Sequence, residues 1–151
     1  KQKKKDASIA AMRKVIELDP KDANALNYLG YTYADLGQNL DEAERLVLEA
    51  LKHKPNDGYI TDSLGWVYYK KGEFEKALQH LKKAGELSNE DPVIMEHIGD
   101  TYLKLNDKAN ALKYYQKSLA KREKEKDKDP EKEREKSELK TKIRQLTEGA
   151  R

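Results

Sequence analysis

The stretch DSLGWVYYKKGEFEKAL, from Asp62 to Leu78, contains the chain's only tryptophan and only phenylalanine, two adjacent tyrosines and two glycines. Such a cluster fits a cofactor site, a surface on which nucleic-acid bases stack, or a piece of helical scaffold. These alternatives differ in whether the stretch is unique, because a scaffold element recurs along the chain at a fixed period.

The stretch is the second of three similar copies. Each copy has a Leu-Gly or Ile-Gly pair, a tyrosine three residues after the glycine, and an alanine further on. The glycines and alanines are Gly30, Gly65 and Gly99, and Ala43, Ala77 and Ala111. The alanines recur every 34 residues, whereas the glycine spacing is 35 and then 34. One extra residue is therefore predicted in a turn at residues 37–39, where an insertion costs little.

Each copy is predicted to form two helices that pack through small residues. Aspartates are placed to cap the first helix, and Pro92 is placed to begin one. Glycine or asparagine then stands where a left-handed residue would end that helix. The predicted caps are Asp22, Asp57 and Asp91, the predicted stops are Gly37, Gly72 and Asn106, and the second helices are predicted to begin near Asp41, Glu73 and Asp107. Residues 7–19 resemble the second helix of an earlier copy.

The pattern changes after about residue 117. Residues 121–138 are almost entirely charged, and Asp129 is predicted to cap a new helix at Pro130. Leu139, Ile143 and Leu146 form one apolar stripe, which predicts a helix that caps the last repeat. The predicted organisation is a solenoid over 1–120 (half-repeat 7–20, repeats 21–55, 56–89 and 90–120), a charged helix extension or linker at 121–130, and a C-terminal capping helix at 131–151.

At these residues the chain resembles the tetratricopeptide repeat (TPR) family, over residues 7–120. The resemblance implies an all-α fold, a right-handed superhelical solenoid of antiparallel helix pairs. The wording of EHIGDTYLKLND, from Glu96 to Asp107, is also similar to the C-terminal part of long bacterial arrays of this repeat. One departure is Thr61, which stands where the family often has tryptophan or leucine.

Composition agrees with an elongated helical protein, since 36% of the residues are apolar and 39% are charged. The net charge of +3 belongs to the ends, because residues 7–120 carry 15 Lys/Arg and 18 Asp/Glu. That distribution disfavours nucleic-acid binding. No apolar run suits membrane insertion. The chain begins at a lysine, which predicts an excised piece whose N-terminal targeting region is missing, so the location, cytoplasmic or periplasmic, stays open.

No catalytic constellation is visible in the sequence. The histidines His53, His80 and His97 lack metal-ligand spacing, and the absence of cysteine excludes thiolate sites. Ser63 lacks the glycines of a nucleophile elbow, and no glycine-rich phosphate loop is present. The sequence therefore predicts a protein that is not an enzyme and needs no cofactor or metal.

The family resemblance implies that the first helices line a concave groove. The residues carried onto this groove, as a predicted partner-binding site, are Asn27, Tyr28, Tyr31, Asp35, Tyr59, Asp62, Trp66, Tyr69, Lys70, Glu96, His97 and Asp100. In the first helix of the second copy, the predicted core stripe is formed by Ile60, Leu64, Val67 and Tyr68. Trp66 and Tyr69 fall outside it, so Trp66 is expected to face the groove and its removal to cost little stability. The alternative is that Trp66 and Tyr31 fill space against an adjacent repeat.

The predicted function is a protein-interaction scaffold. Its aromatic, mildly acidic groove should hold a protein or peptide segment that is apolar or aromatic and carries basic residues. The alternative is a structural role, as the terminal section of a longer array that self-assembles as a homo-oligomer or acts in bacterial envelope or secretion machinery.

Overall fold

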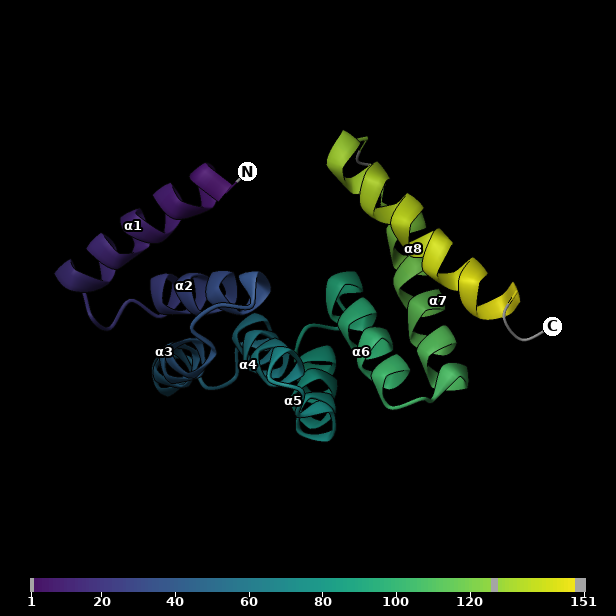
Figure 1. Ribbon diagram of the computed structural model, residues 1–151, viewed down its shortest axis with the longest axis horizontal. Helices are drawn as coiled ribbons and strands as arrows, with labels where there is room; N and C mark the ends of the chain where they lie inside the picture. Colours follow the sequence, from purple (N-terminus) through teal and green to yellow (C-terminus); the bar gives the residue numbers. More distant parts are fainter. Residues whose placement is uncertain (1, 126–127, 149–151) are drawn as a thin grey trace. The chain divides into compact units, whose positions relative to one another are not determined.

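The computed structural model describes residues 2–125 and 128–148. Over these residues the chain is helical and contains no strand, which confirms the all-α prediction. The helices are α1 (Gln2–Leu18), α2 (Ala23–Leu36), α3 (Leu40–His53), α4 (Gly58–Lys70), α5 (Phe74–Leu87), α6 (Pro92–Lys104), α7 (Lys108–Lys124) and α8 (Pro130–Glu148) (Figure 1). The chain divides into two compact units, Lys1–Ser88 and Asn89–Arg151.

The first helix of every repeat begins at an aspartate, as the sequence predicts. In each case the carboxylate accepts a hydrogen bond from the N–H three residues further along, at 3.0, 3.1 and 3.4 Å. These capping residues are Asp22, Asp57 and Asp91. Pro92 is the first residue of α6, where its missing N–H leaves no hydrogen bond unmade.

Just after the first helix of each pair lies a residue with positive φ. The three residues are Gly37 (69°), Gly72 (84°) and Asn106 (62°). The N–H of the following residue donates to the carbonyl of a tyrosine five positions earlier, at 2.9 Å in all three repeats. These bonds satisfy carbonyl groups that would otherwise be orphaned at the helix end. The predicted stops are confirmed.

The two helices of a pair touch through glycine. A Cβ added at Gly30 would lie 2.6 Å from Val47 Cγ2, and one at Gly65 would lie 2.7 Å from Leu81 Cδ2. In the second unit the corresponding atom at Gly99 would lie 2.5 Å from the Tyr115 ring. Any larger residue would therefore push the helices apart. The paired helices are α2 and α3, α4 and α5, and α6 and α7 (Figure 1).

The first unit also contains α1, which packs against α2. This helix covers the segment predicted as the second helix of an earlier repeat, and it begins before that segment, at Gln2.

In the second unit α7 is longer than its counterparts and runs to Lys124. The predicted extension or linker is therefore helical at its start, while residues 126 and 127 lie outside the described part. The N–H of Glu131 donates to the Asp129 carboxylate at 3.0 Å, at the start of α8. α8 packs against α7, and Leu139 is fully buried there. Residues 149–151 of the predicted capping helix also lie outside the described part.

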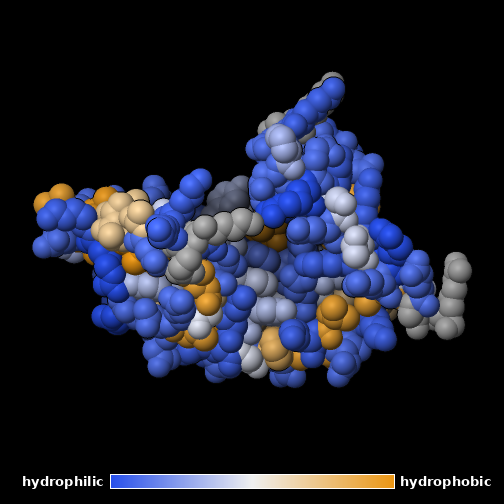
Figure 2. Space-filling view, turned by 45° about the horizontal axis from the view of Figure 1, so that its top comes forward, coloured by the Kyte–Doolittle hydropathy of each residue, from blue (hydrophilic) through white to orange (hydrophobic). Residues whose placement is uncertain are grey.

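The surface drawn in Figure 2 is predominantly hydrophilic, with small separate apolar areas. Across residues 2–125 and 128–148, no helix combines the length and apolar character needed to cross a membrane.

Candidate functional site

The neighbouring first helices α2 and α4 of the first unit carry seven aromatic side chains, and five of them belong to the predicted partner-binding residues. We call these five residues, Tyr28, Tyr31, Tyr59, Trp66 and Tyr69, the aromatic set. Two of them are the most exposed: Tyr28 is 47% exposed and Tyr59 is 59% exposed. Large exposed aromatic side chains are common anchors of protein interfaces.

Trp66 is the centre of a small stack. Its ring lies parallel to that of Tyr69, with centroids 4.3 Å apart and an interplanar angle of 9°. Tyr69 in turn meets the edge of Phe74 at 5.4 Å. The Lys70 ammonium lies 5.4 Å from the centre of the Trp66 ring, within range of a cation–π interaction. The stack therefore already contains the cation–aromatic pairing expected of a basic ligand.

The expectation that Trp66 is exposed is wrong. Its side chain is only 7% exposed. The reason lies in α4, which has α2, α3 and α5 as neighbours. A helix enclosed on several sides is buried around most of its circumference, so a single apolar stripe underestimates its core. Asp62 and Ser63 on the same helix are buried as well, at 6% and 2% exposure.

The polar residues predicted for the site in this unit differ in their surroundings. Asp35 lies 3.6 Å from the Lys5 ammonium, an exposed pair of small energetic worth. The Asn27 side-chain oxygen is buried and accepts no hydrogen bond from the described residues. An unsatisfied buried acceptor of this kind costs about 1–3 kcal/mol. Removal of this oxygen is therefore expected to leave the free energy of unfolding unchanged or to raise it.

In the second unit the predicted residues Glu96 and Asp100 are engaged by other parts of the same unit. The Lys142 ammonium, from α8, lies 2.7 Å from Glu96 Oε2 and 3.0 Å from Asp100 Oδ1. Arg122 from α7 lies 3.4 Å from Glu96 Oε1. His97, the third predicted residue here, is 8% exposed.

Lys142 and Arg122 are absent from the predicted site. The apolar stripe of residues 139–146 predicts a capping helix but says nothing of the charges beside it. The available signal was spacing, since Lys142 follows Leu139 by three residues and so shares its helix face.

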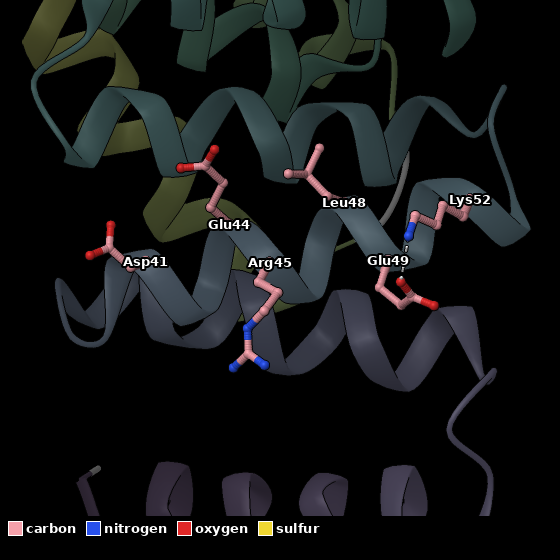
Figure 3. Close-up of a pocket in the computed structure, with 6 residues that line it drawn as sticks. All are labelled: Asp41, Glu44, Arg45, Leu48, Glu49 and Lys52. Carbon is pink, nitrogen blue, oxygen red and sulfur yellow. Dashed lines mark ion pairs between the residues drawn. The ribbon is translucent and has the colours of Figure 1, made fainter.

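A shallow depression runs along the outer surface of α3 in the first unit (Figure 3). It is lined by Asp41, Glu44, Arg45, Leu48, Glu49 and Lys52. Glu44 and Leu48 point to one side of α3 and Arg45 to the other (Figure 3). The lining carboxylates are paired: Lys71 lies 2.8 Å from both Asp41 and Glu44, and Lys52 lies 3.3 Å from Glu49.

The electrostatics of this depression follow from those pairs. Hydrogen bonds from Lys71 lower the pKa of both Asp41 and Glu44, although burial opposes the shift at each. The same bonds raise the pKa of Lys71. These groups therefore stay charged at neutral pH and join α3 to the end of α4, which is a structural role.

Within residues 2–125 and 128–148, no group of three or more His, Asp and Glu side chains could hold a metal ion.

His80 packs against the Tyr68 ring, with ring centroids 5.3 Å apart. Burial lowers the pKa of His80, and the nearby Lys76 and Lys83 lower it further.

Family comparisons agree with this geometry. Two profiles described as tetratricopeptide repeat match residues 33–130 and residues 11–45. The chain belongs to the tetratricopeptide repeat family.

Among characterised sequences, a TPR repeat-containing protein of Pseudomonas aeruginosa is 39% identical over 89 residues, 59% of this chain and 15% of that protein. A TPR repeat-containing protein of Methanocaldococcus jannaschii is 36% identical over 103 residues, 67% of this chain and 18% of that protein. Mouse aspartyl/asparaginyl beta-hydroxylase is 28% identical over 72% of this chain and 15% of the enzyme. The chain thus spans less than a fifth of the length of these relatives.

Solved structures with the same fold include PcrH in complex with the chaperone binding region of PopD, at a TM-score of 0.72 and 19% identity, covering 85% of this chain and 92% of PcrH. MamA matches at a TM-score of 0.64 and 23% identity, covering 79% of this chain and 69% of MamA. These likenesses support the helix-pair repeat fold.

Proposed function

We propose that this chain is a scaffold module that binds a segment of a partner protein on the first helices of its repeats. The segment would be apolar or aromatic and would carry lysine or arginine. The module performs no catalysis of its own in this proposal. Aromatic and carboxylate side chains of this chain recognise the partner segment.

The observation that carries the proposal is the exposure of Tyr28 and Tyr59 on neighbouring helices. Their side chains are 47% and 59% exposed, although both are large and amphipathic. On α4, which also carries Tyr59, the Trp66 ring is stacked on Tyr69 and has the Lys70 cation over it. A ligand that brings an apolar side chain and a cation to this surface would make the same kinds of contact.

Proteins of the same fold lend support to a peptide ligand. PcrH was crystallised with the chaperone binding region of PopD, and SycD with a peptide of the translocator YopD. Sequence identity to both is low, so the chemistry of the ligand proposed here rests on the residues of this chain alone.

Peptide display against the full chain tests the proposal. Selected peptides should be rich in apolar or aromatic residues with Lys or Arg, and should bind the variant with Tyr28→Ala and Tyr59→Ala at least about tenfold more weakly, as expected for loss of anchor residues. Leu48→Ala is the matched control, because Leu48 is 41% exposed but lies on the second helix α3. Equal affinity for the wild-type chain and the tyrosine variant would refute the proposal.

Self-assembly is the competing function. It predicts a mass that rises with concentration in sedimentation experiments, and loss of peptide binding in the assembled form. A monomer at all concentrations that binds the selected peptides would exclude it.

A further inference from the structure

Glu96 and Asp100 form a two-carboxylate site on α6. They lie four residues apart, so their side chains share one helix face. Both are largely shielded from solvent, with side chains 18% and 16% exposed. The Lys142 ammonium lies between them, at 2.7 Å from Glu96 and 3.0 Å from Asp100. The same ammonium is 5.6 Å from the centre of the Tyr115 ring.

Helix α7 also contacts these carboxylates. The Tyr115 hydroxyl donates to Asp100 Oδ1 at 2.5 Å, and Arg122 donates to Glu96 Oε1 at 3.4 Å. Both contacts join α6 to α7, and Arg122 pairs in addition with Glu135 of α8. The site is therefore pre-organised for a cation, and the aromatic ring beside it adds to the attraction.

Lys142 is well matched to this site. Its burial lowers its pKa, but Asp100 and Glu96 outweigh this effect, so the pKa is raised overall. The lysine therefore stays charged at neutral pH while it is docked. Leu139, three residues earlier on the same face of α8, is fully buried, with 0% of its surface exposed to solvent.

Polar contacts add to the apolar docking of α8. Leu139 is the one side chain of α8 that is fully buried among residues 130–148, whereas Ile143 and Leu146 of the predicted stripe are only half-buried. A cap held by its apolar stripe alone would bury all three residues. Besides the Lys142 contacts, α8 makes ion pairs to α7 and its end: Glu135 with Arg122 at 3.0 Å, Lys140 with Glu123 at 4.0 Å and Lys132 with Glu125 at 4.0 Å.

We propose that Glu96 and Asp100 form a lysine-recognition site that α8 fills in cis through Lys142, and that a helical partner segment with leucine and lysine three residues apart replaces α8 there. This inference rests on the proposed function, and it names the recognition element that a partner would present to the second unit. Because α8 is tethered to the site, a partner competes with a high effective concentration of the internal helix.

The experiment uses the full chain and a fluorescent peptide with the sequence of residues 130–148. Wild-type chain should bind the peptide weakly, since α8 occupies the site. The Lys142→Glu chain repels its own α8 from the two carboxylates, so its affinity for the peptide should rise about tenfold or more, as expected when the binding-competent fraction increases. Lys142→Ala, which removes the cation without adding a charge, should give a smaller gain and serves if Lys142→Glu does not fold.

Arg144→Glu is the matched control. It makes the same charge change two residues away on α8, at an exposed arginine. It should leave peptide affinity at the wild-type value. Adding Glu96→Gln and Asp100→Asn to the Lys142→Glu chain should abolish the gain, and a peptide that carries Lys142→Glu should not bind.

Two results would overturn the proposal. One is an unchanged affinity in both Lys142 variants, and the other is a gain that survives the Glu96→Gln and Asp100→Asn changes. Dimerisation of the wild-type chain by exchange of α8 would assign the site to a second copy and so overturn the partner assignment. The display experiment with Tyr28 and Tyr59 uses other residues and other peptides, so a failure of the lysine-recognition site can be told apart from a failure of the proposed function.

Discussion

Replacement of Gly65 by alanine tests how closely α4 and α5 approach. The added Cβ would lie 2.7 Å from both Cγ and Cδ2 of Leu81, and 3.2 Å from the Leu81 backbone nitrogen. Carbon atoms prefer separations of about 3.5–4.0 Å, so roughly 1 Å of overlap must be relieved by moving Leu81 or the helix. Overpacking of this kind costs about 1–3 kcal/mol. Alanine regains about 0.5–1 kcal/mol over glycine in a helix, which leaves a net loss of up to about 2.5 kcal/mol.

Urea unfolding followed by tryptophan fluorescence measures this loss, because the chain's only tryptophan is the residue next to Gly65. A double-mutant cycle with Leu81→Ala isolates the contact. In the Leu81→Ala background the overlap with the side chain is gone, so Gly65→Ala should stabilise by about 0.5–1 kcal/mol through helix propensity. The same free-energy change in both backgrounds would refute the packing argument, as would a Gly65→Ala chain more stable than wild type.

Three other substitutions have expected outcomes. Trp66→Ala should lower the free energy of unfolding by about 3 kcal/mol or more, since its ring is 7% exposed and stacked on Tyr69, and circular dichroism melts will measure this. Asn27→Leu should leave the melting temperature unchanged or raise it, because it removes an unsatisfied buried oxygen, while the affinity for display-selected peptides falls; a gain in peptide affinity would contradict the proposed site. His80 has a lowered pKa in the folded chain, so the folded state binds its proton less tightly than the unfolded state, and stability is lost as the pH falls below about 6.5. The drop in melting temperature between pH 7.5 and pH 5 should therefore be smaller in His80→Asn than in wild type, and an equal drop would show that another group causes it.

The helix boundaries were predictable because they depend on local chemistry. Aspartate caps, left-handed glycine or asparagine stops and Pro92 act through backbone groups within a few residues, so sequence spacing is sufficient to place them. Thr61, the departure from the family pattern, is explained by a similarly local contact. Its hydroxyl donates to the Asp57 carbonyl at 2.9 Å, which lets a polar side chain be 97% buried without an unmade donor.

Burial on α4 and the charge pairing of α6 were not predictable in the same way. Trp66 was misplaced because the exposure of a helix depends on how many neighbours surround it, which a single periodic stripe does not encode. Lys142 and Glu96 are 46 residues apart in the sequence. Spacing from Leu139 places Lys142 on the packed face of α8, but nothing local indicates which carboxylate it meets, since that choice is made by the docking of α8.

The extra residue of the first repeat has a use in protein engineering. It lies in the turn between Leu36 and Leu40, where Asn39 adopts a positive φ of 50°. Beyond it the helices return to register, because Val47 faces Gly30 just as Leu81 faces Gly65. One residue added inside a helix would rotate everything after it by about 100°. This turn is consequently a natural splice point, at which a tag or a graft can lengthen the chain while the interhelical contacts on either side keep their partners.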